Sequence, residues 1–228
     1  MEYDEFLKII RSRRSTRNFK SDPVPDEYIE KILEAARWAM SGANGQPWEF
    51  VVVKDAELRK KLVDIYEESR YRTHLIESTR SAELRHPGAA KAPKDFIRFA
   101  NAPVIIVVCG DPRTIQASVL TASFLSGAKV FHENLANTTQ MICLAASVLG
   151  LGAEWVSLSP PFDERFKAAL GIPDLFRIDT IVPIGYTPYK PAPPYRRKLE
   201  EIMHWNRYDM KKFRSDEQIM EFLRLLRQ

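Results

Sequence analysis

Residues 11–19 have the sequence Arg-Ser-Arg-Arg-Ser-Thr-Arg-Asn-Phe, which brings four arginines together with the hydroxyls of Ser15 and Thr16. Guanidinium groups are planar and permanently charged, and they suit phosphate oxygens, to which hydroxyls can also donate. Each charge-assisted hydrogen bond contributes about 1.5 to 3 kcal/mol, so three or four of them would retain a phosphorylated ligand. The stretch indicates an anion site, although a solvated charged face or a salt-bridge hub is equally compatible with these residues alone.

The composition is that of a globular protein with one core. The chain has 228 residues, of which 45% are apolar, so we expect a single domain over residues 1–228. Its 34 cations and 30 anions make a mixed surface, which favours a small anionic ligand over nucleic acid. The longest apolar run, residues 102–109, is far shorter than the roughly 20 residues that cross a bilayer, and the polar N-terminus differs from a signal peptide. We therefore expect a soluble, cytoplasmic protein.

The cysteines and histidines do not predict a metal site. Cys109 and Cys143 lie in apolar surroundings without Cys-x-x-Cys spacing, so we expect both to be core thiols. His132 and Glu133 begin like the zinc motif His-Glu-x-x-His, but the second histidine position is Ala136.

Two helices are predicted around the arginine stretch. The first spans residues 2–12 and the second begins after Pro25. A helical stripe of apolar residues in the second ends at Gly42 and predicts core packing: Ile29, Ile32, Leu33, Ala36 and Met40.

A turn rich in small and amide residues then leads into a strand over residues 48–53. Gly42 and Gly45 permit close approach of a ligand, while Asn44 and Gln46 offer donors and acceptors suited to the edge of a heteroaromatic ring. Taken alone, this turn is better explained as a helix end followed by a loop.

The motifs R-R-S-T-R-N-F, P-V-P-D-E, E-A-A-R-W-A and S-G-A-N-G-Q-P-W-E-F-V-V-V follow one another here. In this order and spacing they resemble the N-terminal half of the nitroreductase superfamily of FMN-dependent oxidoreductases, and the resemblance extends over about residues 5–205. It implies an α+β fold of three α/β/α layers, in which helices flank a central, mostly antiparallel sheet. It also implies an intertwined homodimer with an extended C-terminal arm.

The resemblance further implies which residues bind FMN. The phosphate and the pyrimidine edge would lie on the first arginine stretch, at Arg13, Arg14, Ser15 and Arg17. The partner subunit's loop, with Ser41, Gly42, Asn44 and Gln46, would cover the ring. A later turn, formed by Ser157, Leu158 and Ser159, would reach flavin N5, and a basic pair in the arm, Arg196 and Arg197, would close on the phosphate. Met40 departs from the family's usual proline and is expected to alter the approach of the loop.

The remaining elements are predicted from periodicity. We expect a helix over residues 55–69, a charged, irregular lid over 70–100, and a strand buried on both faces over 102–109. A helix that is apolar almost all round follows over 129–149, then a strand over 153–159, a short helix near 166–170 and a last core strand over 178–186. Pro183 predicts an edge position or a local bulge in that strand, and residues 187–228 are expected to form an extended arm with a C-terminal helix capped by Ser215 and Gln218.

The predicted activity is ping-pong transfer of a hydride from NADH or NADPH through FMN to a small aromatic acceptor, such as a nitroaromatic or a quinone. A flavin needs little acid or base catalysis, which agrees with the lack of a triad or carboxylate pair in the sequence. Arg17 is expected to stabilise negative charge on reduced FMN, and Ser157 or Ser159 to bond N5.

Two alternatives remain open. A reductive dehalogenase of halogenated tyrosine, in the same superfamily, would use Glu67 and Tyr71, four residues apart, with the later Lys94 to bind the amino acid. A non-catalytic polyanion-binding protein would use the arginines alone, and its binding would weaken steeply with salt.

Overall fold

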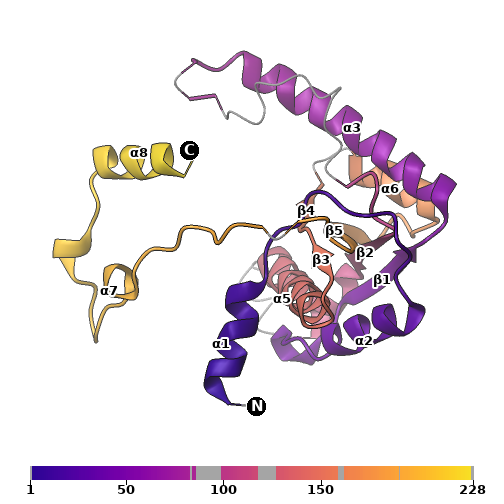
Figure 1. Ribbon diagram of the computed structural model, residues 1–228, viewed down its shortest axis with the longest axis horizontal. Helices are drawn as coiled ribbons and strands as arrows, with labels where there is room; N and C mark the ends of the chain where they lie inside the picture. The colour runs from indigo at the N-terminus through magenta and orange to yellow at the C-terminus, as the bar shows by residue number, and fades with distance from the viewer. Residues whose placement is uncertain are drawn as a thin grey trace.

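The computed structural model describes residues 2–82, 84–85, 99–117, 127–158, 162–189 and 191–226. A five-stranded sheet lies at its centre, with the strand order β1-β2-β5-β3 and with β4 also paired to β5 (Figure 1). All of these pairings are antiparallel. The strands are β1 (Trp48–Val53), β2 (Val104–Gly110), β3 (Gly152–Ala153), β4 (Val156–Ser157) and β5 (Arg177–Gly185).

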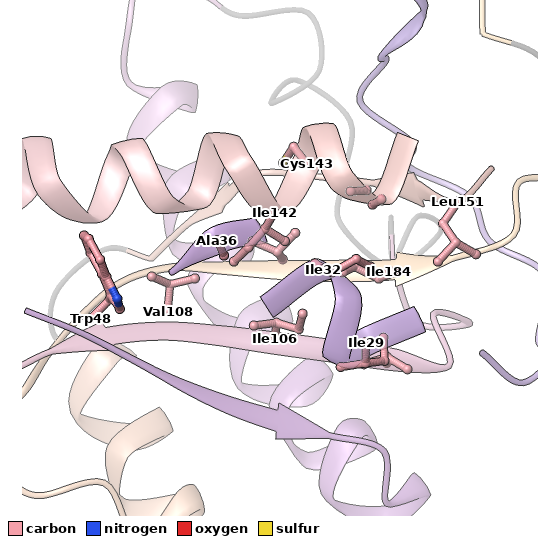
Figure 2. Close-up of a cluster of buried hydrophobic side chains, with 14 of the residues drawn as sticks. Ile29, Ile32, Ala36, Trp48, Ile106, Val108, Ile142, Cys143, Leu151 and Ile184 are labelled. Carbon is pink, nitrogen blue, oxygen red and sulfur yellow. The ribbon is translucent and has the colours of Figure 1, made fainter. Parts of the chain in front are cut away.

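Helices cover both faces of the sheet. All seven residues of β2 are buried, which confirms the predicted central strand. Even-numbered residues of β2 join one core cluster with α2 (Asp26–Ala36) and α5 (Gly127–Val148), which Figure 2 shows around Ile106 and Ile142. Odd-numbered residues join a second cluster with α3 (Ala56–Ser78) and α6 (Phe162–Leu170). Because alternate side chains of a strand point to opposite faces, one apolar run supports both layers, and the expected three-layer fold is confirmed.

The N- and C-terminal segments lie outside this body (Figure 1). Helix α1 (Tyr3–Ser12) begins at a capping box of Glu2 and Glu5, and it lies against α5. From residue 186 to 198 the described chain forms neither helix nor strand, as the prolines predicted. The chain then leaves the body and ends in α7 (Leu199–Ile202), the 3-10 turn η4 (Met210–Lys212) and α8 (Asp216–Leu225) (Figure 1). Ser215 accepts from the backbone N–H of Gln218 and starts α8, so the predicted capping box is confirmed.

Two helix boundaries were predicted wrongly. Helix α2 ends at Ala36 in a tight turn, in which the backbone N–H of Ala39 donates to Ala36, so Met40 lies outside the stripe and is 79% exposed. Helix α3 continues to Ser78, so residues 70–78 are helical rather than irregular. These residues lack a clear apolar stripe, and local helix propensity together with hydrogen bonds such as Thr73 Oγ1 to the carbonyl of Ser69 extends the helix. Most of the predicted lid, residue 83 and residues 86–98, lies outside the described residues.

Pro183 was also interpreted wrongly, because β5 is a central strand with β2 on one side and β3 and β4 on the other. The bulge falls at Asp179, which is skipped between the pairs Val108 with Thr180 and Cys109 with Ile178. Pro183 instead lies opposite Glu154, within the two-residue gap between β3 and β4. Since proline has no N–H, it can only accept there, and its carbonyl accepts from the N–H of Glu154 at 3.3 Å. The predicted single strand over 153–159 is therefore two short strands in one register.

None of the described helices is both long enough and apolar enough to cross a membrane.

Candidate functional site

The arginine stretch lies along β3, where the backbone fixes its position. Ser15 forms a parallel bridge with Ala153, and the N–H of Thr16 donates to the carbonyl of Ala153 at 2.9 Å. A Cβ at Gly152 would come within 2.3 Å of Thr16 Oγ1, so only glycine allows the two segments to approach this closely. This contact between residues 15–16 and 152–153, hereafter the seam, positions the side chains on either side of Thr16.

The arginine stretch and the start of the arm enclose a cavity of about 480 Å³, within the usual range for small-molecule sites. Five of the predicted cofactor residues line it, although one of them is distant in sequence: Arg13, Arg14, Ser15, Arg17 and Arg196. The arm adds Tyr189, Pro191, Ala192 and Pro194. No acidic side chain belongs to this described lining, so its polar side chains are four guanidiniums and two hydroxyls.

Arg14 connects the two walls of the cavity. Its Nε donates to the carbonyl of Ala192 at 3.2 Å, and its Nη1 donates to the carbonyls of Arg13, at 2.8 Å, and of Arg11. A rigid fork that binds backbone on both sides keeps the arm against the arginine stretch.

The basic pair of the arm is divided. Arg196 lines the cavity, whereas Arg197 donates from Nη2 to the carbonyl of Glu201 at 3.0 Å and pairs with its carboxylate at 3.4 Å. Arg197 thus stabilises the turn at α7 and is not part of the described cavity lining. Of the two arginines predicted to close on one ligand, only Arg196 belongs to the described cavity lining.

Arg17 has an ion-pair partner that sequence analysis missed. Its Nε lies 3.2 Å from Oε1 of Glu154, and the exposed fractions of the two side chains are 49% and 7%. Glu154 stands in the gap between β3 and β4, next to the seam. The available signal was a single carboxylate within the otherwise apolar run Leu149–Val156.

The loop after α2 is strained and is anchored to α5. Ala43, Asn44 and Gln46 have φ values of 52°, 53° and 42°, a left-handed region that side chains with a Cβ rarely adopt. The N–H of Gly42 donates to Asn134 Oδ1 at 2.9 Å, and Asn137 Nδ2 donates to the carbonyl of Met40 at 3.1 Å. Such strain persists where surrounding contacts enforce it, and it is frequent at ligand sites. The loop does not line the arginine cavity of its own chain.

A comparison of the whole sequence with family models matches residues 10–186 to the nitroreductase family. The chain belongs to the nitroreductase family. The matched range includes the arginine stretch, the strained loop and every strand of the sheet. The family assignment therefore rests on residues that build the fold and one wall of the cavity, while the arm residues of the other wall lie beyond the match.

Two relatives and one solved structure illustrate the similarity. A protein of Archaeoglobus fulgidus, provisionally named an NADH dehydrogenase/NAD(P)H nitroreductase, is 32% identical over 80% of this chain and 86% of its own. Iodotyrosine deiodinase 1 of Mus musculus is 30% identical over 89% of this chain and 70% of its own. The crystal structure of an oxidised iodotyrosine deiodinase with FMN and 3-iodo-L-tyrosine has a TM-score of 0.70 at 21% identity, covering 89% and 99% of the two chains, which supports the fold.

The turn predicted to reach flavin N5 is described only in part. Ser157 ends β4 with an exposed side chain and pairs with Thr180, while Leu158 is half-buried against the second core cluster. Ser159 lies outside the described residues. Neither Ser157 nor Leu158 lines the arginine cavity.

Two of the three residues of the dehalogenase alternative, Glu67 and Tyr71, lie on α3. Glu67 and Tyr71 are one helical turn apart and so share a face; Glu67 is half-buried and Tyr71 is 52% exposed. Lys94 lies outside the described residues.

Both cysteines are core thiols, as predicted. Burial raises the pKa of Cys109 and of Cys143 to about 11, so neither is a thiolate near neutral pH.

Proposed function

We propose that this chain is an FMN-dependent oxidoreductase that transfers a hydride from NADH or NADPH to a small organic acceptor such as a nitroaromatic or a quinone. The observation that carries the proposal is the cavity in which both ends of the chain present arginines without any acidic side chain in the described lining. When bound, FMN would supply the redox chemistry: it would accept a hydride, two electrons and one proton, from NAD(P)H and pass two electrons and that proton to a quinone, which takes its second proton from water.

The donor set fits the phosphate of FMN. Arg13, Arg14, Ser15 and Arg196 would bind this dianion, because guanidinium forks and a hydroxyl match its oxygens. A volume of about 480 Å³ is large enough for a phosphate with part of a ribityl chain and ring. Arg17, on the same wall, would face the part of the ring where negative charge develops on reduction.

A homodimer is part of this proposal. None of the described side chains of α7 and α8 is buried, and large apolar groups such as Trp205, Met210 and Phe213 are exposed along the arm. An apolar groove of about 510 Å³ between α1, α2 and α5 is equally uncovered in the single chain. Burying apolar surface of this extent favours association with a second copy. In such a dimer the strained loop of one subunit would lie over the flavin of the other, where Ser41, Gly42, Asn44 and Gln46 would contact the ring.

The test is an anaerobic visible spectrum of the purified protein before and after NADH or NADPH is added, with the molecular mass measured by light scattering. A yellow dimer that bleaches on addition of either nucleotide would support the proposal. An Arg13→Ala variant should lose FMN, whereas Arg59→Ala, which changes the same charge on α3, should retain it. A colourless protein that takes up no added FMN would refute the cofactor assignment, and salt-sensitive polyanion binding would then be the better account of the arginines.

A second candidate is reductive dehalogenation of a halogenated tyrosine, favoured by the shared face of Glu67 and Tyr71 and by the relatives named for that activity. The reaction would replace a carbon–iodine bond by carbon–hydrogen, consuming two electrons and a proton and releasing iodide. Titration of the oxidised flavoprotein with 3-iodo-L-tyrosine tests it, because binding should change flavin fluorescence. The change should weaken in Glu67→Gln but not in Glu57→Gln, a charge-matched control on the same helix. Unaltered fluorescence at millimolar ligand would exclude this candidate.

A further inference from the structure

Glu154 is a buried carboxylate beside the arginine cavity that the proposed function does not use. Its Oε1 lies 3.2 Å from Nε of Arg17, and its side chain is 7% exposed. Taking a carboxylate out of water is unfavourable unless a cation compensates for it, and Arg17 contributes such compensation to Glu154.

The pair is built on rigid backbone. Arg17 follows Thr16, and Glu154 follows Ala153, the two residues that the 2.9 Å hydrogen bond of the seam joins. The N–H of Glu154 also donates to Pro183 in the central strand β5 at 3.3 Å. Both partners therefore start from backbone atoms that are fixed relative to each other, and the pair does not depend on flexible loops.

The geometry engages Arg17 from one side. The contact is made at Nε, on one edge of the planar guanidinium, so the opposite edge points away from Glu154 while Arg17 lines the cavity. The carboxylate thus orients the fork, and it also offsets one of the four positive charges around the cavity. Since reduced FMN carries more negative charge than oxidised FMN, every uncompensated cation near it favours the reduced form.

We propose that Glu154 is a positioning residue that orients Arg17 and partly cancels its charge, and thereby lowers the reduction potential of FMN bound in the cavity. This inference rests on the proposed FMN-binding function. It assigns to the buried ion pair a role in setting the driving force of electron transfer, beyond retention of the cofactor.

The test is an anaerobic titration of FMN-loaded protein against redox dyes of known potential, a readout that needs no turnover. Glu154→Gln keeps an oxygen that can accept from Arg17 Nε but removes the charge. We expect reduced FMN to gain about tenfold in affinity relative to oxidised FMN, which corresponds to a rise of about 30 mV for a two-electron couple. Glu49→Gln removes the same charge from β1, at the opposite edge of the sheet, and should leave the potential unchanged.

Arg17→Gln provides an independent measurement. It should lower the potential, and Glu154→Gln should raise the potential less in this background than in the wild type, because part of its effect acts through Arg17. An unchanged potential in Glu154→Gln with FMN bound would overturn the inference while leaving the proposed function intact. If Glu154→Gln fails to fold, an Arg17→Gln protein that binds FMN at the wild-type potential would overturn it equally. Failure of the wild-type protein to bind FMN would remove both proposals.

Discussion

The seam predicts a specific effect of the substitution Gly152→Ala. A Cβ at this position would lie 2.3 Å from Oγ1, 2.6 Å from Cβ and 2.7 Å from Cγ2 of Thr16. These three atoms belong to a short side chain that is 2% exposed, so it has no space into which to rotate. The backbone of residues 15–17 must therefore move away from β3.

The cost follows from this geometry. Overpacking of a filled site lowers the free energy of unfolding by about 1 to 3 kcal/mol. For a domain of this size, each kcal/mol lowers the Tm by roughly 2 to 4 °C. The displacement also moves the arginines next to Thr16. Loss of one charge-assisted hydrogen bond to phosphate, about 1.5 to 3 kcal/mol, weakens FMN binding by about 10- to 150-fold.

The assay combines thermal unfolding of the apoprotein with FMN titration followed by fluorescence quenching. Gly171→Ala is the matched control, since Gly171 has φ +66° with nothing within 4 Å of an added Cβ. It should cost about 1 kcal/mol through backbone strain alone and leave FMN affinity unchanged. Adding Thr16→Gly to Gly152→Ala removes all three clashing atoms and should restore part of the lost affinity. Wild-type FMN affinity in Gly152→Ala would refute the argument that the seam positions the arginines.

Three further predictions follow from contacts elsewhere. Arg196→Ala should raise the Kd for FMN by about 10- to 150-fold, whereas Arg197→Ala should change it less than about twofold in the same titration, because only the first arginine lines the cavity. Lys167→Met should lower the free energy of unfolding in urea by about 2 kcal/mol. The reason is that this buried ammonium donates to the carbonyls of Asp174, at 2.9 Å, and Phe176, at 3.3 Å. An unchanged urea midpoint would contradict this prediction. Burial raises the pKa of Cys109 and Cys143 from 9.0 to about 11, so the unfolded state loses these thiol protons at a lower pH than the folded state does. The free energy of unfolding should therefore fall as the pH rises from about 9 to 11. Cys143→Ala should show a shallower fall in a pH series of urea melts, and an equally steep fall would contradict the role of this thiol.

Much of the fold was predictable because its core elements carry strong local patterns. The apolar run of β2 indicates a strand covered on both faces, whatever its neighbours are. Helix α5 is apolar on more than one side because Ile142 and Ala146 face the sheet while Leu144 and Val148 line the outer groove. The prolines after Tyr186 exclude regular pairing, and Ser215 with Gln218 marks the start of α8.

The errors concern features that depend on distant segments. Pro183 is acceptable in a central strand only because the gap between β3 and β4 lies opposite it. The pairing of β3 and β4 with β5 cannot be predicted from the residues around Pro183 alone. Met40 continues the helical stripe of α2 in sequence, but the turn after Ala36 takes the chain to α5, where Asn137 bonds its carbonyl.

The same distinction separates the predictable and the unpredictable parts of the site. The arginine stretch is recognisable because its residues are adjacent, and Arg196 was expected through the resemblance of the arm. The pairing of Arg17 with Glu154 joins residues 137 positions apart and depends on the seam. Arg197 is bonded to Glu201, one turn later at α7, a contact that the sequence analysis did not consider. Local sequence supplies the charges, but their assignment to ligand or to protein depends on the tertiary contacts.

The arm explains why these contacts matter for binding. Its proline-rich start forms one wall of the cavity, yet that wall is connected to the other by Arg14, whose Nε is bonded to the carbonyl of Ala192. Beyond residue 198 no described helix of the arm has a buried side chain that would fix it to the same chain. The wall is therefore held at one end by Arg14 and at the other by whatever covers the arm. If a second copy covers it, as proposed, dimerisation and FMN binding must strengthen each other by the same factor, because linkage between two binding equilibria is reciprocal.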